Sequence, residues 1–340
     1  MRSVLLTGGA GFIGSNLVRY LVANRPELRI VNLDALTYAG NLDNLRGVPA
    51  DRHTFVHGSI CDRALVEKLL AEHDVDTVMH LAAESHVDRS ITGPGAFIET
   101  NVTGTFTLLE AARTVWKTGQ RRFHHVSTDE VYGALTPDQV APAEGAPYAP
   151  TSPYAASKAA SDHLVLAYAR TYGMDVTISN CTNNYGPYQF PEKLIPLMIN
   201  NALIGTHLPI YGDGKQIRDW LHVEDHCEAI VAIAERGRSG ETYHVAGGVQ
   251  PTNLEIVEQL CAHLDERRPA SPHMPHRQLM KSVTDRLGHD RRYALDTSKI
   301  ASELGWKPRH TLADGLAATV EWYLTAIDWL SAIRAKKETS

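Results

Sequence analysis

The sequence predicts an α/β protein with a Rossmann-type, doubly wound parallel sheet and a smaller C-terminal domain. Three observations support this fold class. Strand-like and helix-like segments alternate over the first 180 residues. A glycine-rich turn joins the first strand to the first helix. After about residue 180, prolines and glycines break the chain into shorter pieces, which is typical of loops that build a pocket over such a sheet.

The predicted strands of the first half are short apolar runs at 3–6, 29–33, 54–56, 77–79, 123–126 and 176–179. The first helix follows the glycines and continues through Leu21. Further helical patterns lie between the later strands, at 62–73, 95–117 and 154–172. Because a helix follows almost every strand, we expect a parallel sheet with helices on both faces.

The second half contains helical patterns at 223–234, 253–264 and 311–330. We expect residues 1–180 to form the dinucleotide-binding domain, with a return segment near 208–250. Residues 181–330 are expected to form a discontinuous domain that binds the substrate. The sequence does not reveal where the chain crosses between the two domains.

Composition narrows the possible partners. The chain has 340 residues and a formal net charge of -6, which disfavours nucleic acid and anionic membrane surfaces as partners. No apolar run reaches the length of a membrane span. The four cysteines, Cys61, Cys181, Cys227 and Cys261, lie far apart, so we expect reduced thiols in a cytoplasmic protein.

The turn after the first strand has the pattern of a dinucleotide site. Gly8, Gly11 and Gly14 let backbone N–H groups approach a pyrophosphate at a helix N-terminus. Asp34 ends the second strand 20 residues beyond Gly14, where a carboxylate holds the ribose diol and repels a 2′-phosphate. The alternative is a glycine turn with a capping aspartate. The combined pattern favours NAD over NADP as the cofactor.

Tyr154 and Lys158 lie four residues apart on a predicted helix and therefore share one face. An ammonium near the phenol is expected to lower the tyrosine pKa from its usual value of about 10. Such a tyrosine can accept an alcohol proton while hydride leaves the same carbon. The pair is common in sequences, but after a dinucleotide motif it indicates hydride-transfer chemistry.

Thr128, Asp129 and Glu130 follow the strand at 123–126. Two adjacent carboxyl groups beside a hydride-transfer site suit an elimination, with one neutral acid and one charged base. Neighbours on a strand point to opposite faces, so both reach one site only if the strand ends near Thr128. The alternative is an ordinary helix start, where acidic residues favour the dipole.

No metal site is expected. His222, Glu224 and His226 resemble a metalloprotease helix, but the glutamate is one place off and no third ligand is evident.

The dinucleotide motif together with Tyr154 and Lys158 resembles the extended short-chain dehydrogenase/reductase superfamily. Over nearly the whole length, the chain is similar to the dTDP-glucose 4,6-dehydratases. The matching runs are 33–41, 81–88, 127–133, 183–188, 191–196, 218–220 and 288–293. This resemblance implies conversion of dTDP-glucose to dTDP-4-keto-6-deoxyglucose and water, with NAD as cofactor, for deoxysugar biosynthesis. It also implies a homodimer formed through the helices at 95–117 and 154–172.

The resemblance further implies residue roles. Thr128 would bind the sugar 4-hydroxyl, Asp129 would protonate the leaving 6-hydroxyl, and Glu130 would remove the C5 proton. Residues implied at the cofactor, beyond those already named, are Phe12, Ile13, Ala35, Leu36, Thr37, Ser59, Ile60, Leu81, Ala82, Ala83, Thr100 and Asn184. Residues implied at the substrate are Ser85, Asn183, Lys193, Leu194, Pro209, Ile210, Tyr211, Arg218, Asn253, Arg286 and His289.

One position departs from the family pattern, because Ser59 stands where the family has an aspartate that contacts adenine. A serine keeps the hydrogen bond but loses the charge. Other reactions on the same scaffold stay open: a UDP-sugar 4,6-dehydratase, a nucleotide-sugar 4-epimerase or a UDP-glucuronate decarboxylase. A non-catalytic NAD-binding regulator would not need Thr128, Asp129, Glu130, Tyr154 and Lys158 together.

Overall fold

A seven-stranded parallel sheet forms the centre of the computed structural model, which describes residues 1–285 and 288–338. The strand order is β10-β6-β5-β4-β1-β2-β3. The strands are β1 (Ser3–Thr7), β2 (Arg29–Asp34), β3 (His53–His57), β4 (Thr77–His80), β5 (Arg122–Thr128), β6 (Val176–Cys181) and β10 (Glu241–Val245). The predicted Rossmann-type sheet is therefore confirmed. The strand order reverses between β1 and β4, where doubly wound sheets bind ligands.

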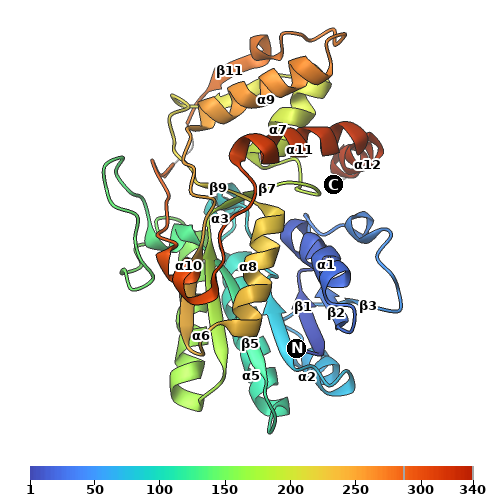
Figure 1. The fold of residues 1–340 in the computed structure, drawn as a ribbon, viewed down its shortest axis with the longest axis vertical. Coiled ribbons are helices and arrows are strands. Elements are labelled where there is room, and N and C mark those ends of the chain that lie inside the picture. The colour runs from blue at the N-terminus through green and yellow to red at the C-terminus, as the bar shows by residue number, and fades with distance from the viewer. Residues whose placement is uncertain (286–287, 339–340) are drawn as a thin grey trace.

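Helices cover both faces of the sheet (Figure 1). On one face α1 (Phe12–Asn24) packs against α8 (Val223–Arg236). The other face carries α2 (Arg63–Glu72), α5 (Gly104–Val115) and α6 (Pro153–Tyr172). Each face has its own buried apolar cluster, and burial of this kind stabilises by about 25 cal/mol per Å². The two layers hold the carboxyl ends of the strands at a common edge.

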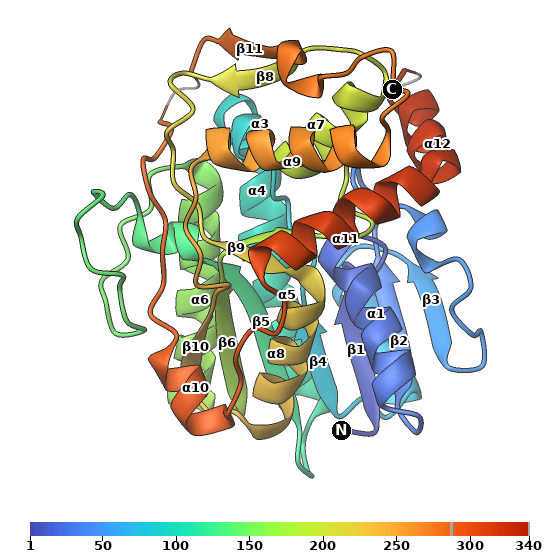
Figure 2. The same ribbon diagram turned by 45° about the horizontal axis from the view of Figure 1, so that its top comes forward.

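A second group of elements lies above that edge (Figure 2). It contains α7 (Leu194–Leu203), α9 (Asn253–Arg267), α11 (Leu312–Thr325) and α12 (Ile327–Glu338). It also contains β8 (Leu208–Tyr211), which pairs with β11 (Met280–Val283), while β7 (Asn183–Tyr185) pairs with β9 (Trp220–His222). A separate apolar cluster joins these helices and β8. Within residues 1–285 and 288–338, no helix is long and apolar enough to cross a membrane.

The structure corrects several predicted elements. The single helix expected at 311–330 is wrong, because α11 ends at Thr325 and α12 starts at Ile327. The helix expected at 95–117 is a chain of α4 (Gly95–Phe97), a π-helical segment η2 (Ile98–Thr103) and α5. Helix α7 was missed because it contains Pro196, but a proline in the first turn removes an N–H that has no helical partner. The shorter elements α3 (Val87–Thr92) and α10 (Ser298–Leu304) were also missed.

Candidate active site

One large cavity lies at the carboxyl edge of the sheet, between the sheet and the second group of elements. Its volume is about 540 Å³. It is lined by the glycine turn after β1, by segments that follow β2, β4, β5 and β6, and by α6 and the start of α7. The topology therefore brings together residues that lie up to 285 positions apart, from Gly8 to Tyr293. A cavity of this size is typical of a binding site for a cofactor or small molecule.

The glycine turn forms a cradle that only glycines allow. A Cβ at Gly14 would lie 2.2 Å from the Gly8 carbonyl oxygen, and Gly8 has a φ of +77°. The N-cap of α1 is Gly11, and no side chain caps this helix. The N–H groups of its first turn therefore face the cavity beside Phe12 and Ile13. This is a site for an anionic pyrophosphate, so the residues present fit a dinucleotide.

Asp34 lies at the end of β2 and lines the cavity, as predicted. Its carboxylate oxygens accept the N–H groups of Ala10 at 2.8 Å and of Leu36 at 2.7 Å. Burial raises the pKa of Asp34, while these two hydrogen bonds oppose the rise. The backbone thus fixes the orientation of the carboxylate, and each oxygen keeps a lone pair for a ribose hydroxyl.

The π-helical segment η2 positions the far wall of the cavity. Asn101 accepts the Glu84 N–H at 2.8 Å and donates to the Glu84 carbonyl at 3.0 Å. Its amide also donates to the Ser157 hydroxyl on α6 at 2.9 Å. Thr100, the neighbour of Asn101, lines the cavity. Segments of π-helix occur frequently at functional sites, and this one connects the segment after β4 to helix α6.

The structure meets the condition under which the carboxyl groups of Asp129 and Glu130 can both reach one site, namely that the strand ends near Thr128. Strand β5 ends at Thr128, and a 3₁₀ turn, η3 (Asp129–Tyr132), begins directly afterwards. The Thr128 hydroxyl caps this turn by accepting the Glu130 N–H at 3.3 Å. Thr128, Asp129 and Glu130 all line the cavity. The turn lets two sequence neighbours face one space, which a continuing strand would prevent.

Asp129 has the properties of a neutral acid. Its residue is 4% exposed, and its Oδ1 accepts the Thr128 hydroxyl at 3.2 Å. Burial, followed by the charge of the adjacent Glu130, raises the pKa of Asp129 well above its usual value. A carboxyl group kept protonated at neutral pH can donate a proton to a leaving hydroxyl. Burial and the raised pKa favour the protonated form of Asp129, which is the form that its predicted role as the acid requires.

Tyr154 and Lys158 both line the cavity from α6, as their spacing predicts. Their interaction differs from the prediction. The Lys158 ammonium donates to the Val126 carbonyl at 2.9 Å and lies 3.2 Å from Nε2 of His125. Burial and then the Glu130 carboxylate raise the pKa of Tyr154 well above its usual value. The prediction of a lowered tyrosine pKa is therefore wrong where only the protein's own groups act on Tyr154.

Lys158 predicts a pH dependence. Burial lowers its pKa to about 8, and Asp162 opposes this change. Lys158 is therefore charged below pH 8 and neutral above it, and a positive charge favours a phenolate at Tyr154. We expect kcat to fall as the pH rises through about 8. In Lys158→Arg this fall is expected to disappear, because arginine stays charged up to pH 12 or so. An unchanged alkaline limb in that variant would assign the titration to another group.

The structure brings most of the predicted site residues to this cavity. Among residues with predicted contacts to cofactor or substrate, those found in its wall are Gly8, Gly11, Phe12, Ile13, Gly14, Asp34, Ala35, Thr37, Ser59, Ile60, Leu81, Ala82, Ala83, Ser85, Thr100, Asn183, Asn184, Lys193, Leu194, Tyr211, Arg218, Asn253 and His289. The wall also includes Thr128, Asp129, Glu130, Tyr154 and Lys158. Arg286 lies outside the described residues.

Three predicted residues do not line the cavity. Leu36 packs against the cluster between α1 and α8, at a φ of 50°. Ile210 points into the cluster of the second group of elements, since side chains alternate along β8. Pro209 is on the same side of β8 as the cavity residue Tyr211 but two residues further away. Ser59 remains in the wall, and its hydroxyl accepts the Cys61 N–H at 3.1 Å.

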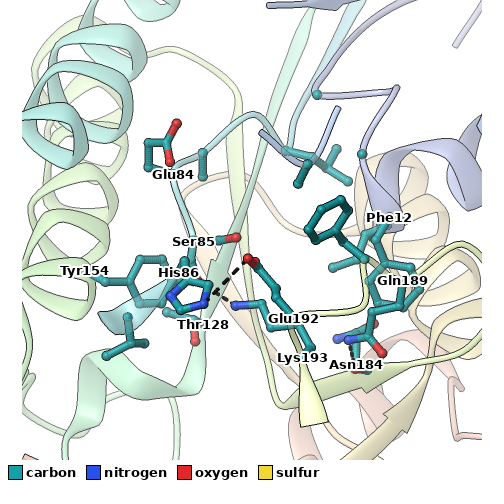
Figure 3. A pocket seen from close by; sticks show the side chains of 18 of the residues that line it. Phe12, Glu84, Ser85, His86, Thr128, Tyr154, Asn184, Gln189, Glu192 and Lys193 are labelled. Atoms are coloured by element: carbon teal, nitrogen blue, oxygen red, sulfur yellow. Dashed lines mark hydrogen bonds and ion pairs between the residues drawn. The ribbon is translucent and has the colours of Figure 1, made fainter. Parts of the chain in front are cut away.

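The structure adds residues that the sequence predictions missed. His86 lies 3.6 Å from a carboxylate oxygen of Glu192, and the Lys193 ammonium donates to the Ser85 carbonyl at 2.9 Å (Figure 3). These contacts join the segment after β4 to the segment before α7. Tyr293 also lines the cavity, under the Arg218 guanidinium at 4.4 Å. The position of His86 just beyond β4 was an available signal, because carboxyl ends of parallel strands gather at the ligand site.

Among the described residues, His222, Glu224 and His310 form a possible metal-binding group, whereas His226, part of the motif that resembles a metalloprotease helix, is not in it. The ligand atoms of the group lie within 4.8 Å of one another. The imidazoles of His222 and His310 stack with ring centroids 4.1 Å apart, so their nitrogens do not converge as tetrahedral ligands would. His226 instead contacts the Asn184 amide oxygen at 2.9 Å. We assign no metal to this group.

Comparisons with known proteins agree with this geometry. Residues 5–319 match the family model described as GDP-mannose 4,6 dehydratase. The dTDP-glucose 4,6-dehydratase of Xanthomonas campestris is 56% identical, over 98% of this chain and 96% of its own length. The Escherichia coli K12 protein dTDP-glucose 4,6-dehydratase 1 is 52% identical, over 98% of this chain and 95% of its own length.

Solved structures separate the dehydratases from the epimerases. The dTDP-glucose 4,6-dehydratase of Streptomyces venezuelae, solved with NAD bound, has a TM-score of 0.89 and 50% identity, and covers 96% of this chain and 98% of its own. The UDP-glucose 4-epimerase of Thermotoga maritima has a TM-score of 0.84 but only 29% identity, and covers 96% and 99%. The fold is shared by both groups, whereas sequence identity favours the dehydratases. The chain belongs to the dTDP-glucose 4,6-dehydratase family.

Proposed function

We propose that the protein converts dTDP-glucose to dTDP-4-keto-6-deoxyglucose and water, with NAD bound. The observation that carries this proposal is the strand end at Thr128. It places the buried acid Asp129 and the carboxyl group of Glu130 in one cavity with Tyr154. Epimerisation or decarboxylation on this scaffold does not need an acid and base pair. The dehydratases named above support the same reaction.

The dinucleotide part of the cavity lies at the glycine turn. The first turn of α1 binds the pyrophosphate, and Asp34 binds a ribose diol and excludes a 2′-phosphate. When bound there, NAD would supply the hydride acceptor for C4 and the hydride donor for C6, and its positive charge would favour a phenolate at Tyr154.

The protein groups move the protons. Tyr154 takes the proton of the 4-hydroxyl, and Thr128 holds that hydroxyl in place. The C4 ketone acidifies the C5 hydrogen, which Glu130 removes. Asp129 gives its proton to the 6-hydroxyl, which leaves as water. The enone that results takes a hydride at C6 and a proton at C5, which Glu130 delivers after exchanging with solvent.

The sugar nucleotide occupies the part of the cavity under α7. The second group of elements, with the segment that leads to it, supplies the polar side chains of this part: Asn183, Lys193, Arg218, Asn253 and His289. Cationic and amide side chains of this kind suit a diphosphate. We propose that residues 1–180, with a return segment near 208–250, form the NAD-binding domain. Within that segment α8 and β10 pack with the large sheet, whereas β8 lies in the second group of elements. Residues 181–330 form the discontinuous substrate domain.

A product assay tests the reaction and the nucleotide together. The purified protein is incubated separately with dTDP-glucose and UDP-glucose, without stoichiometric NAD. We expect the 4-keto-6-deoxy product from dTDP-glucose, identified by mass spectrometry, because the cofactor is regenerated in each cycle. Preferred turnover of UDP-glucose would show that the proposed nucleotide is wrong. A C4 epimer as the product would show that the proposed reaction is wrong.

We further propose a cytoplasmic homodimer. Ile91 on α3, Ile98 on η2, Phe106 on α5 and Tyr172 on α6 are between 42% and 53% exposed, and apolar groups on one helical layer support an interface. Sedimentation equilibrium is expected to give twice the chain mass, and Phe106→Glu to lower it. The four cysteines are free, which supports a reducing compartment.

A further inference from the structure

The proposed reaction leaves one proton on the wrong group of the enzyme. At the start Tyr154 must be a phenolate, and Asp129 must be a protonated acid. After one turnover Tyr154 holds the proton of the 4-hydroxyl, and Asp129 has lost its proton to the departing water. Glu130 has returned a proton to C5, and the electron pair that left C4 has returned at C6. Substrate and products differ by no net proton, so one proton must pass from Tyr154 to Asp129 before the next cycle.

The Thr128 hydroxyl lies between these two groups. It donates to Oδ1 of Asp129 at 3.2 Å. Tyr154 lines the same part of the cavity as Thr128 (Figure 3). The Thr128 hydroxyl is near enough to the Tyr154 phenol to lower the pKa of Tyr154, against the larger effect of burial. One oxygen atom therefore connects the base of the oxidation step to the acid of the elimination step.

Other routes to Asp129 are poor. Asp129 is 4% exposed and Thr128 is 7% exposed, so bulk water has little access to either group. The second oxygen of Asp129 is buried with no hydrogen-bond partner among the described residues. The Lys158 ammonium on α6 donates to the Val126 carbonyl and contacts His125, and it makes no hydrogen bond to Asp129.

We propose that Thr128 relays the proton from Tyr154 to Asp129 at the end of each turnover. The phenol O–H bond of Tyr154 breaks as a new O–H bond forms on Oγ1 of Thr128. The proton that Thr128 carried passes to Oδ1 of Asp129. Tyr154 becomes a phenolate, Asp129 becomes neutral, and Thr128 is unchanged, so no solvent proton is needed. This inference rests on the proposed function, because only an elimination separates the two protons.

Pre-steady-state kinetics test the relay with two substitutions. Thr128→Val keeps the shape of the side chain and removes the hydroxyl, whereas Thr128→Ser keeps the hydroxyl. Before substrate is added, slow exchange with solvent sets the correct protonation state in every variant. Because Thr128 also holds the 4-hydroxyl, we expect Thr128→Val to slow the first turnover and to slow later turnovers much more. The ratio of first to later rates is therefore expected to rise on the order of 10²-fold over wild type. Thr128→Ser is expected to keep the wild-type ratio.

Small acids in the buffer give a second readout. Formic acid or imidazolium at increasing concentration is expected to raise the steady-state rate of Thr128→Val without changing its first turnover. The relay is wrong if Thr128→Val slows the first and later turnovers equally, makes no product in the first turnover, or matches wild type in both. Failure of the proposed function would look different, since the wild-type protein itself would then form no 4-keto-6-deoxy sugar.

Discussion

Tyr154→Phe is expected to lower kcat by roughly 10²- to 10⁴-fold, because it removes the group that takes the proton of the 4-hydroxyl. The phenylalanine keeps the ring, which packs edge-on against Phe97 with centroids 6.3 Å apart. The fold and KM should therefore change little. Steady-state assays with dTDP-glucose and a thermal melt measure the two effects separately.

Tyr172→Phe is a matched control for this substitution. Tyr172 lies at the end of the same helix, is 53% exposed and does not line the cavity. Its variant is expected to keep wild-type turnover. If Tyr154→Phe also kept wild-type turnover, Tyr154 would have no part in the proton transfer.

Asp129→Asn is expected to block the loss of water while sparing the oxidation at C4. A neutral aspartic acid and an asparagine have nearly the same shape, so the substitution removes the transferable proton and little else. We expect elimination to slow by roughly 10²- to 10⁴-fold. In a single turnover, a 4-keto-hexose that keeps its 6-hydroxyl should accumulate. Rapid quench and mass spectrometry detect it as the substrate less two hydrogens.

Asp138→Asn is the matched control, because Asp138 is exposed on the segment after β5 and lies outside the cavity wall. It is expected to behave as wild type. If Asp129→Asn slowed C4 oxidation and water loss to the same degree, Asp129 would serve the whole site and would not be the specific acid.

The sequence predicts this site well where chemistry and local geometry coincide. The four-residue spacing of Tyr154 and Lys158 fixes a shared helical face, and the glycine turn with Asp34 fixes a dinucleotide site. The pair Asp129 and Glu130 needed one condition, a strand end at Thr128, and the structure meets it.

Other features depend on contacts that the sequence does not reveal. Strand β10 joins the sheet beside β6 through a pairing more than 60 residues distant in sequence. The π-helical winding that directs Asn101 to Glu84 has no signature in the apolar pattern. The pKa of Tyr154 depends on burial and on Glu130, which the spacing of Tyr154 and Lys158 cannot show. Leu36 and Ile210 were misplaced because backbone conformation and strand alternation turn their side chains into apolar clusters.

An isotope experiment tests the central claim, that Tyr154, Asp129 and Glu130 carry out an elimination through a transient C4 ketone. dTDP-glucose with deuterium at C4 is converted in ordinary water, and unlabelled substrate is converted in D₂O. We expect the C4 deuterium to reappear at C6 and solvent deuterium to enter at C5, as read by NMR of the product. Deuterium that returned to C4 with inverted configuration would rule out this elimination, because the enzyme would then be an epimerase.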